Sequence, residues 1–433
     1  MRLVSSWGRL SSNLHRVIEL RDPCSTQKEI VNNTGGLAYG NGRSYGDVCL
    51  NPEGVLWHTL GLNHFIFFDP ESGRLVCEAG VLLRDIQQLF IPRGWILPVT
   101  PGTQFVTVGG AIANDVHGKN HHSSGTFGNH VLRIRILRSN GDIIECSPQK
   151  NIDWFAATLG GLGLTGVITE VEIQMKSVPS PWLETETISY SNLDEFFRLA
   201  DDSVADWEHT VSWVDSLSKS SGRGLFIRAN PTHSGLGKPP KKRTFTMPFV
   251  PPVSLVNELT LRPLNAAYYF MNKCRSSRRT LQHYEPFFYP LDNIVKWNRL
   301  YGPKGFFQYQ CVLPRETGKD ALIALLHEIK RSRAGSFLAV LKTFGDRPSI
   351  GMLSFTQSGV TLALDFPNKD VWTLRLFDRL DAIVKEAGGR LYLAKDARMS
   401  REFFESSYPR LQTFMKYRDP SISSSMSRRL MGS

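Results

Sequence analysis

The chain has 433 residues with a net charge of +11, and 41% of them are hydrophobic, which is enough for two or three domains with buried cores. No apolar run approaches the ~20 residues that a transmembrane helix needs, and the first residues lack the apolar centre of a secretory signal. Six cysteines occur without a C-x-x-C pair, which argues against a zinc site or a disulfide framework and predicts a reduced, cytoplasmic protein.

Short strands dominate the first third of the predicted secondary structure. They cover residues 54–60, 74–80, 130–139 and 142–148, and a hairpin turn at Asn140 and Gly141 joins the last two. A helix that ends at a glycine is predicted over 82–94. Residues 153–178 predict a short helix, a glycine turn and a long strand. Up to about residue 176 the pattern indicates one α+β unit.

The pattern changes after residues 177–182. Strands are then predicted at 306–314, 337–345 and 359–367, and amphipathic helices at 318–332 and 371–389. This alternation is typical of an antiparallel sheet covered by helices. The tail, residues 390–420, is predicted to be helical. The sequence thus indicates an α+β protein with a first domain over 1–176, completed by 386–433, and a second domain over 177–385.

Three glycine-rich stretches lie in the first domain: "GNGRSYGD" at 40–47, a stretch at 101–131, and "GGLGLTGVI" at 160–168. The glycines of the first stretch miss the spacing of a Rossmann fingerprint by one residue. Each stretch alone is compatible with a tight turn. Three of them in one domain imply that the backbone approaches a large, flat ligand.

Four histidines lie within the second stretch: His117, His121, His122 and His130. Imidazoles suit zinc or iron, but no carboxylate or cysteine accompanies these histidines at ligand spacing. Hydrogen bonds to backbone carbonyls are the structural alternative. No metal is expected.

Basic residues gather at "KPPKKR" (238–243) and "RSSRR" (275–279), on either side of a stretch rich in proline and apolar residues. Ordinary solvated surface charge is one interpretation, and attraction of an anionic partner is the other. No helix-turn-helix, zinc-finger or aromatic RNA-binding pattern accompanies these runs, so nucleic acid is not expected as a partner.

In their order along the chain, these stretches resemble the FAD-binding domain of the vanillyl-alcohol oxidase type of FAD-linked oxidases. Within that superfamily, the chain most closely resembles the family of decaprenylphosphoryl-β-D-ribose 2-oxidases. The matching stretches are "GNGRSYGD", "PGTQFVTVGGAIANDVHGKNHHSSGTFGNHV", "GGLGLTGVI", "KWNRLYGPKGFFQYQ", "FLAVLKTFG", "LDFPNKD", "GGRLYLAKDAR" and the final "RDP" and "RRL". They follow the family's order over nearly the whole length.

The resemblance implies an FAD-dependent oxidoreductase that oxidises the 2-hydroxyl of a polyprenylphosphoryl ribose to a 2-keto sugar. A separate NADH-dependent reductase would complete the epimerisation to the arabinose form. The basic region 236–280 would cover the lipid phosphate, in peripheral contact with the inner face of a membrane. Two alternatives remain. One is an aldonolactone or alditol oxidase that uses oxygen, although the tail lacks the His-Trp-Ala-Lys type ending of those relatives; the other is a flavin-binding subunit without catalysis.

By the same resemblance, residues 40–47 surround the FAD pyrophosphate, where backbone N–H groups form an anion site. Arg43 stands where relatives carry a histidine bonded to the flavin, and no cysteine lies near Thr103, so FAD is expected to be held non-covalently. The residues implied to hold FAD are Gly40, Asn41, Gly42, Arg43, Ser44, Tyr45, Pro101, Gly102, Thr103, Val108, Gly109, Gly110, Asn114, His117, Gly118, Asn120, Ser124, Gly125, Asn129, Gly163, Gly166, Val167 and Lys395.

The resemblance places Lys395 beside flavin and substrate as a fixed positive charge, with Tyr392 and His117 as further catalytic residues. An ordinary surface lysine is the alternative. The residues matched to the substrate pocket are Tyr301, Gln308, Gln310, Lys342 and Trp213. Gln308 and Gln310 alternate on a strand and share one side, which could also lie in water. Trp213 could belong to the core.

Two features depart from the family. The segment 21–40, which precedes the first glycine-rich loop, is shorter than the same segment in the family and is expected to lack a helix. On the strand 359–367, Ala363 replaces a cysteine of the mycobacterial-type enzymes, and Thr361 replaces an asparagine. These changes remove a target for thiol-directed inhibitors and alter contacts to the sugar, without affecting hydride transfer.

Overall fold

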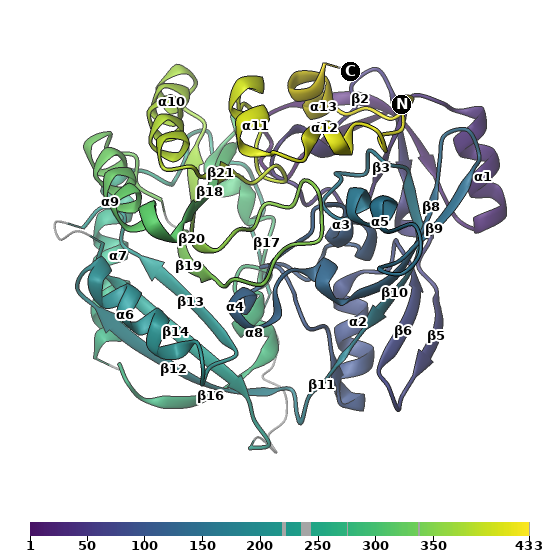
Figure 1. Ribbon diagram of the computed structural model, residues 1–433. Helices are drawn as coiled ribbons and strands as arrows, with labels where there is room; N and C mark the ends of the chain where they lie inside the picture. The colour runs from purple at the N-terminus through teal and green to yellow at the C-terminus, as the bar shows by residue number, and fades with distance from the viewer. Residues whose placement is uncertain (219–221, 235–243, 275, 337, 433) are drawn as a thin grey trace.

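The computed structural model describes residues 1–218, 222–234, 244–274, 276–336 and 338–432. Figure 1 shows two lobes, with the N-terminal part of the chain on one side and the sheet of the middle part on the other. The C-terminal helices lie across one end of the molecule, and both termini are found at that end (Figure 1).

The first sheet has the strand order β1-β2-β4-β3. Its strands are β1 (Arg2–Ser5), β2 (Ser12–Glu19), β3 (Gly36–Tyr39) and β4 (Val55–His58). Because β2 and β3 both run parallel to β4, the chain must cross back between them, and α1 (Pro23–Asn32) does so. The Asp22 side chain accepts a hydrogen bond from Ser25 N (2.9 Å) and caps α1. The prediction that residues 21–40 lack a helix is therefore wrong.

The second sheet is antiparallel, with the order β5-β6-β10-β8-β9. Its strands are β5 (Phe65–Asp69), β6 (Arg74–Glu78), β8 (Val131–Leu137), β9 (Ile143–Cys146) and β10 (Val167–Gln174). The predicted hairpin is confirmed, because Gly141 joins β8 to β9 with φ of 92°. Three helices share a core with this sheet: α2 (Leu83–Phe90), α3 (Val108–Ala113) and α5 (Ile152–Thr158). A two-stranded ribbon of β7 (Trp95–Ile96) and β11 (Lys176–Ser177) follows.

The third sheet has eight antiparallel strands in the order β16-β12-β14-β13-β19-β20-β18-β21. They are β12 (Trp182–Tyr190), β13 (His209–Val214), β14 (Gly224–Pro231), β16 (Arg279–His283), β18 (Phe306–Pro314), β19 (Ala339–Phe344), β20 (Gly359–Pro367) and β21 (Arg390–Leu391). One core joins the sheet to α6 (Leu193–Ser203), α9 (Arg315–Arg331) and α10 (Val371–Glu386). The predicted α+β class, with an antiparallel sheet covered by helices, is confirmed.

Further elements lie around this sheet. They are α4 (His121–Ser124), α7 (Glu258–Lys273), α8 (Tyr284–Phe288) and a parallel ribbon of β15 (Phe245–Thr246) and β17 (Ile294–Val295). The contacts of α4 are with β19, and those of α7 are with β12 and β14.

The tail differs from its prediction at its start. Arg390 and Leu391 form β21 and pair with β18, after which Tyr392 N donates to the carbonyl of Gln310 (2.9 Å) and extends the ladder. Helices begin only at α11 (Arg401–Ser407) and continue with α12 (Leu411–Phe414) and α13 (Ser425–Met431). One strand of residues 386–433 thus belongs to the eight-stranded sheet. The division into two domains stays a prediction.

Candidate active site

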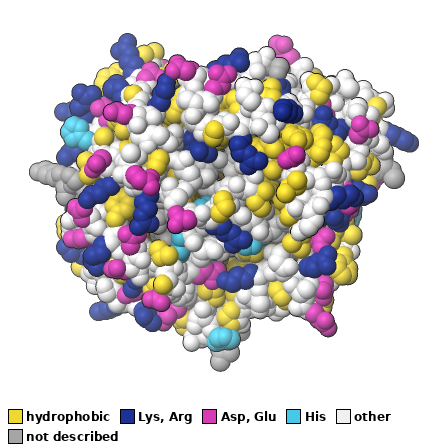
Figure 2. Space-filling view, viewed as in Figure 1, with side chains coloured by type: hydrophobic (Ala, Val, Ile, Leu, Met, Phe, Trp, Pro, Cys, Tyr) yellow, Lys and Arg dark blue, Asp and Glu magenta, His cyan; other side chains and the backbone are white. Residues whose placement is uncertain are grey.

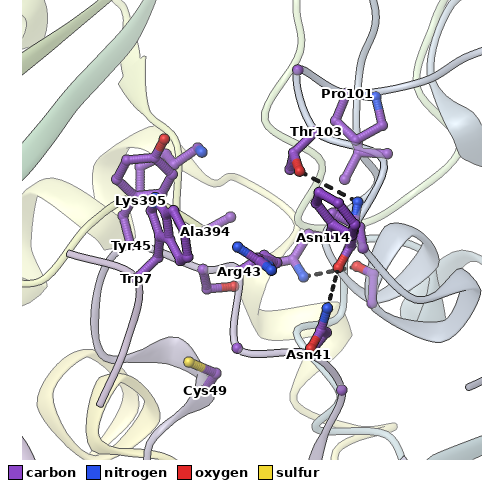
Figure 3. Close-up of a pocket in the computed structure, with 18 of the residues that line it drawn as sticks. Trp7, Asn41, Arg43, Tyr45, Cys49, Pro101, Thr103, Asn114, Ala394 and Lys395 are labelled. Carbon is purple, nitrogen blue, oxygen red and sulfur yellow. Dashed lines mark hydrogen bonds between the residues drawn. The ribbon is translucent and has the colours of Figure 1, made fainter. Parts of the chain in front are cut away.

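A cavity of about 620 Å³ lies where the three glycine-rich stretches meet the inner face of the eight-stranded sheet. This volume is within the range of roughly 300–1,000 Å³ that ligand pockets occupy. One wall is backbone of residues 40–45, 101–103 and 109–110, and the other consists of side chains from β18, β19 and β20. Figure 3 shows Lys395, Tyr45 and Trp7 close together, with Arg43 and Asn114 further along the wall.

The loop 40–45 requires glycine at position 42. Gly42 has φ of 58°, and a Cβ there would overlap the hydroxyl of Tyr39. Asn41 Nδ2 donates to the carbonyl of Phe105 (2.8 Å), which ties the loop to the second glycine-rich stretch (Figure 3). The loop therefore presents its backbone to the cavity in a fixed conformation.

Arg43 is a partly buried cation on this wall. Its guanidinium carbon lies 4.4 Å from the ring centroid of Trp7 and 5.1 Å from that of Phe105. Burial lowers the pKa of Arg43. Its Nε has no hydrogen-bond partner among the described residues. An N–H donor in such a position suits an anionic ligand.

The glycine loop is joined to the turn that carries Lys395. Tyr45 N donates to the carbonyl of Ala394 (3.1 Å), and a Cβ at Gly46 would overlap the carbonyl of Asp396. Only a glycine at position 46 allows the two backbones to approach so closely.

Replacing Gly46 with alanine is therefore expected to destabilise the protein by about 1–3 kcal/mol, the scale of overpacking a fixed structure. Thermal unfolding measures this effect. The control is Gly102→Ala, where an added Cβ meets nothing within 4 Å, and both variants are compared with the native chain after removal of any bound ligand. An unchanged unfolding temperature of the Gly46 variant would contradict the close approach.

Arg429 of α13 connects the same two segments through charge. Its Nη2 lies 2.9 Å from Oδ1 of Asp47 and 3.0 Å from Oδ2 of Asp396. Asp47 ends the first glycine-rich stretch, and Asp396 follows Lys395. The C-terminal helix therefore helps to position both sides of the cavity.

Lys395 is a half-buried lysine on the cavity wall, not an ordinary surface lysine. Its Nζ lies 3.6 Å from the ring centroid of Tyr45 (Figure 3). Burial lowers the pKa of Lys395 to about 7, and the nearby Asp365 carboxylate opposes that shift. A negative group bound in the cavity would favour the charged form of Lys395.

Asp365 lies behind the cavity wall and is fully buried. Its Oδ1 accepts a hydrogen bond from Gln308 Nε2 (2.6 Å), and its Oδ2 accepts one from the hydroxyl of Tyr301 (3.5 Å). Burial raises the pKa of Asp365 to about 7, whereas Gln308, Lys395 and Tyr301 act to lower it. The sequence reasoning did not select this residue.

His117 is held between Lys342 and Gln310. Its Nδ1 lies 3.1 Å from Lys342 Nζ, which also donates to the carbonyl of Gly118 (3.1 Å), and its Nε2 lies 3.0 Å from Gln310 Nε2. Burial lowers the pKa of His117 well below its usual value and the pKa of Lys342 to about 7. A charged Lys342 can only donate, so the proton of the neutral ring then lies on Nε2, and the Gln310 amide must turn its oxygen toward that N–H to accept it. The charge of Lys342 thus selects the tautomer of His117.

The structure brings most of the predicted site residues to the cavity. Gln308 and Gln310 are buried and line it together, so the alternative of a polar face in water is wrong. Also on the wall are Lys395, Tyr392, His117, Lys342, Gly40, Asn41, Gly42, Arg43, Ser44, Tyr45, Pro101, Gly102, Thr103, Gly109, Gly110, Asn114, Gly163 and Gly166.

The remaining predicted residues do not line this cavity in the described structure: Val108, Gly118, Asn120, Ser124, Gly125, Asn129, Val167, Tyr301 and Trp213. Asn120 Nδ2 donates to the carbonyl of Pro98 (2.8 Å), and Asn129 Oδ1 accepts from Thr126 N (2.8 Å), so both stabilise loops. Trp213 packs edge-on against Tyr268 of α7, with ring centroids 5.0 Å apart. Wall residues that the sequence reasoning missed include Trp7, Phe105 and Trp297.

The histidines of residues 117–130 form no metal site in the part of the chain that the structure describes. His122 Nε2 lies 2.8 Å from the carbonyl of Trp207, and His130 Nε2 lies 2.8 Å from that of Ser124. These two side chains therefore have the structural role that was the alternative to metal binding.

The cavity wall fits FAD in two respects. Arg43 Nε and Asn114 Oδ1 are buried and unpaired among the described residues, so they remain for a ligand. A Cβ added at Gly102 or at Gly163 would meet nothing within 4 Å, so open space lies directly beside the backbone. A large flat group with an anionic part satisfies both conditions.

Comparisons with known proteins agree with this assessment. Residues 31–147 match the family model of the FAD binding domain. The decaprenylphosphoryl-beta-D-ribose oxidase of Mycolicibacterium smegmatis is 36% identical, over 98% of this chain and 96% of that protein. An uncharacterised protein of Streptomyces coelicolor is 32% identical over 81% of this chain and its own full length. The L-gulonolactone oxidase of Bos taurus is 26% identical over 88% of this chain and 84% of that protein.

The fold, the cavity and these matches define an FAD-dependent oxidoreductase with a fold of the vanillyl-alcohol oxidase type. Within this class, the chain belongs to the decaprenylphosphoryl-β-D-ribose oxidase family. The lactone oxidases are more distant relatives.

Proposed function

We propose that the protein oxidises the 2-hydroxyl of a polyprenylphosphoryl ribose to the 2-keto sugar. An NADH-dependent reductase would then complete the epimerisation to the arabinose form. The observation that carries the proposal is the cavity itself, in which a glycine-lined wall suited to FAD faces the half-buried lysines Lys342 and Lys395 and the buried Gln308 and Gln310. The relative from Mycolicibacterium smegmatis is named for oxidation of such a substrate.

Bound FAD supplies the acceptor for a hydride from the carbon that carries the hydroxyl. The backbone of residues 40–45, with Arg43, holds the pyrophosphate. Lys395 would provide positive charge to the bound flavin from its place on the cavity wall. His117 stays neutral because burial lowers its pKa, and its two ring nitrogens hold Lys342 and Gln310 in place. In its neutral form Lys342, whose pKa is lowered to about 7, can take up the hydroxyl proton at Nζ.

Tyr392 has a positioning role in this scheme. Its hydroxyl donates to the carbonyl of Asn114 (3.0 Å), and its ring stacks on Phe355 with centroids 4.6 Å apart. Burial raises the pKa of Tyr392 above its usual value, so the phenol stays protonated. Gln308, Gln310 and Lys342 present donors and acceptors to the sugar. The hydroxyl of Tyr301 donates to Asp365, and Trp213 packs against Tyr268 of α7, so both would support the site from outside the cavity wall.

FAD is expected to leave the protein completely on denaturation. Arg43 and Thr103 occupy the places of the attachment residues, and neither a guanidinium nor a hydroxyl forms the flavin bond. Acid precipitation, followed by absorbance of the supernatant and of the washed pellet, measures the release. Flavin that stays with the washed polypeptide would contradict the prediction.

Substrate class is tested by anaerobic flavin bleaching with detergent-solubilised polyprenylphosphoryl ribose, ribose and an aldonolactone. Bleaching by the lipid phosphate supports the proposal. Bleaching by the lactone alone would favour an oxygen-using lactone oxidase instead. Absence of bleaching by all three would favour the flavin-binding subunit without catalysis.

The charge distribution gives limited support to membrane contact. On the face seen in Figure 2, Lys and Arg side chains are interspersed with Asp and Glu, and no single-sign field stands out. The basic stretch with Lys238, Lys241, Lys242 and Arg243 lies outside the described residues. No helix in the described ranges has the length and apolarity to cross a bilayer. A peripheral contact and the reductase partner remain proposals.

A further inference from the structure

The helix α7 has an apolar face that points away from the protein. It buries Leu261, Asn265 and Tyr269, a stripe that repeats every four residues. The rest of its surface is exposed and mostly apolar: Leu259, Pro263, Leu264, Ala267, Phe270 and Met271. A helix on a protein surface normally has charged residues on that side. The outward face of α7 is therefore suited to a non-aqueous partner.

The chain before α7 extends this apolar surface. Phe245, Phe249, Val253 and Leu255 are all exposed. We call these four residues together with the outward face of α7 the α7 patch. Monomeric proteins rarely expose so many large apolar side chains in one segment unless the segment binds something.

The α7 patch is connected to the cavity wall through one hydrophobic cluster. Leu261 of α7 and Val256 pack in this cluster with Tyr45 and Trp297, and both of these line the cavity. The parallel pairing of β15 with β17 places Phe245 opposite Ile294, another cavity residue. A partner that covers the patch would therefore lie close to the ligand in the cavity.

The charges around the patch are basic. Arg262, Lys273, Arg278 and Arg279 are exposed, and Arg279 is paired with Glu184 of β12 (3.4 Å). Glu258, the one acidic residue of α7, is paired with Arg262 (2.6 Å). Apolar side chains bordered by Lys and Arg are typical of segments that lie in the interface of an anionic bilayer.

We infer that the α7 patch binds the surface of an anionic lipid bilayer and brings the cavity to a substrate held in that bilayer. The second half of this inference rests on the proposed function. A second copy of the chain is a weaker candidate, because a two-fold contact through this patch would bring two basic borders together.

The inference is tested by sedimentation of the FAD-loaded protein with vesicles of equal parts phosphatidylcholine and phosphatidylglycerol. The patch variant carries Leu259→Ser, Phe270→Ser and Met271→Ser, at positions that are 87%, 54% and 63% exposed. The control carries Leu3→Ser, Ile152→Ser and Val371→Ser, at 64%, 58% and 57% exposure in three other elements. Vesicle partitioning should fall by at least about tenfold in the patch variant and stay unchanged in the control. High salt should weaken the binding of the native protein.

Two results would overturn the inference. One is equal partitioning of the patch variant and the native protein. The other is a native protein that is a dimer in sedimentation velocity and a patch variant that is a monomer, when neither protein binds vesicles. Bleaching by the detergent-solubilised substrate separates this question from the proposed function. The patch variant should keep the native bleaching rate in detergent and lose rate only on vesicle-borne substrate. A protein that binds vesicles and oxidises no lipid phosphate would contradict the proposed function alone.

Discussion

Lys395→Ala is expected to retain bound FAD and to lose roughly 10²–10³-fold in the rate of substrate-dependent flavin bleaching, the scale for removing one fixed electrostatic group from an active site. Lys395 is the half-buried cation that lies over the Tyr45 ring, on a backbone turn joined to the glycine loop. Its charge would act on the bound flavin at short range. Stopped-flow measurement at saturating substrate isolates this step from binding.

The control for this variant is Lys369→Ala, which removes an exposed lysine that does not line the cavity. That variant should bleach at the native rate. A spectrum of the Lys395 variant that matches the native one establishes that the cofactor is still held. Bleaching of the Lys395 variant at nearly the native rate would remove Lys395 from the proposed mechanism.

The strand pattern of the second domain could be predicted because it depends on local periodicity. Gln308 and Gln310 alternate on one strand, and this spacing alone puts both on one side. The same alternation runs through Thr361, Ala363 and Asp365 on β20, and the register pairs Asp365 with Gln308. The signal for Asp365 was therefore present. A lone carboxylate in an apolar strand gives no indication of the lysine that it will face.

Other parts of the site depend on contacts between distant residues. Trp7 reaches Arg43, and Arg429 reaches Asp47, only after the N- and C-terminal segments have packed beside the glycine loop. No spacing in the sequence predicts such contacts. The helical prediction for residues 390–420 failed at its start for a similar reason. Arg390 and Leu391 become a strand because the open edge of β18 offers hydrogen-bond partners.

The exposed face of α7 is a third feature that could not be predicted from the sequence. Its sequence, "ELTLRPLNAAYYFMNK", is apolar at ten of sixteen positions, a share that a helix packed into a core can also have. Only the structure shows that its buried stripe is narrow and that most of its apolar side chains lie outside. An apolar helix on a surface and one in a core therefore differ in their surroundings and not in their composition.

The charges of the buried Asp365 and the half-buried Lys395 depend on each other. Burial lowers the pKa of Lys395 to about 7, and the Asp365 carboxylate acts against that shift. Burial raises the pKa of Asp365 to about 7, and Lys395 acts against that shift in turn. The two groups titrate as a unit, and each charge stabilises the other. Asp365 does not line the cavity, so its effect on the reaction passes through Lys395.

Asp365→Asn should therefore change the pH dependence of flavin bleaching more than its maximum rate. Asparagine keeps an oxygen for the Gln308 hydrogen bond and removes the negative charge that favours protonated Lys395. The pKa of Lys395 falls further, so Lys395 loses its proton at lower pH. In the pH profile of the bleaching rate, the alkaline limb should move to lower pH by at least about one unit. One unit corresponds to about 1.4 kcal/mol between the two protonation states of Lys395.

The matched control is Tyr301→Phe, which removes the other hydrogen bond to Asp365, at 3.5 Å, the weakest of the influences that lower the pKa of that carboxyl, and keeps the ionisable group. Its pH profile should stay near that of the native enzyme. A structural role of Asp365 would lower the rate equally at every pH in the asparagine variant. Such a uniform loss, or an alkaline limb that stays in place, would show that Asp365 does not control the charge of Lys395. If the alkaline limb moves in the asparagine variant alone, then Asp365 contributes to the reaction by its charge and not by its packing.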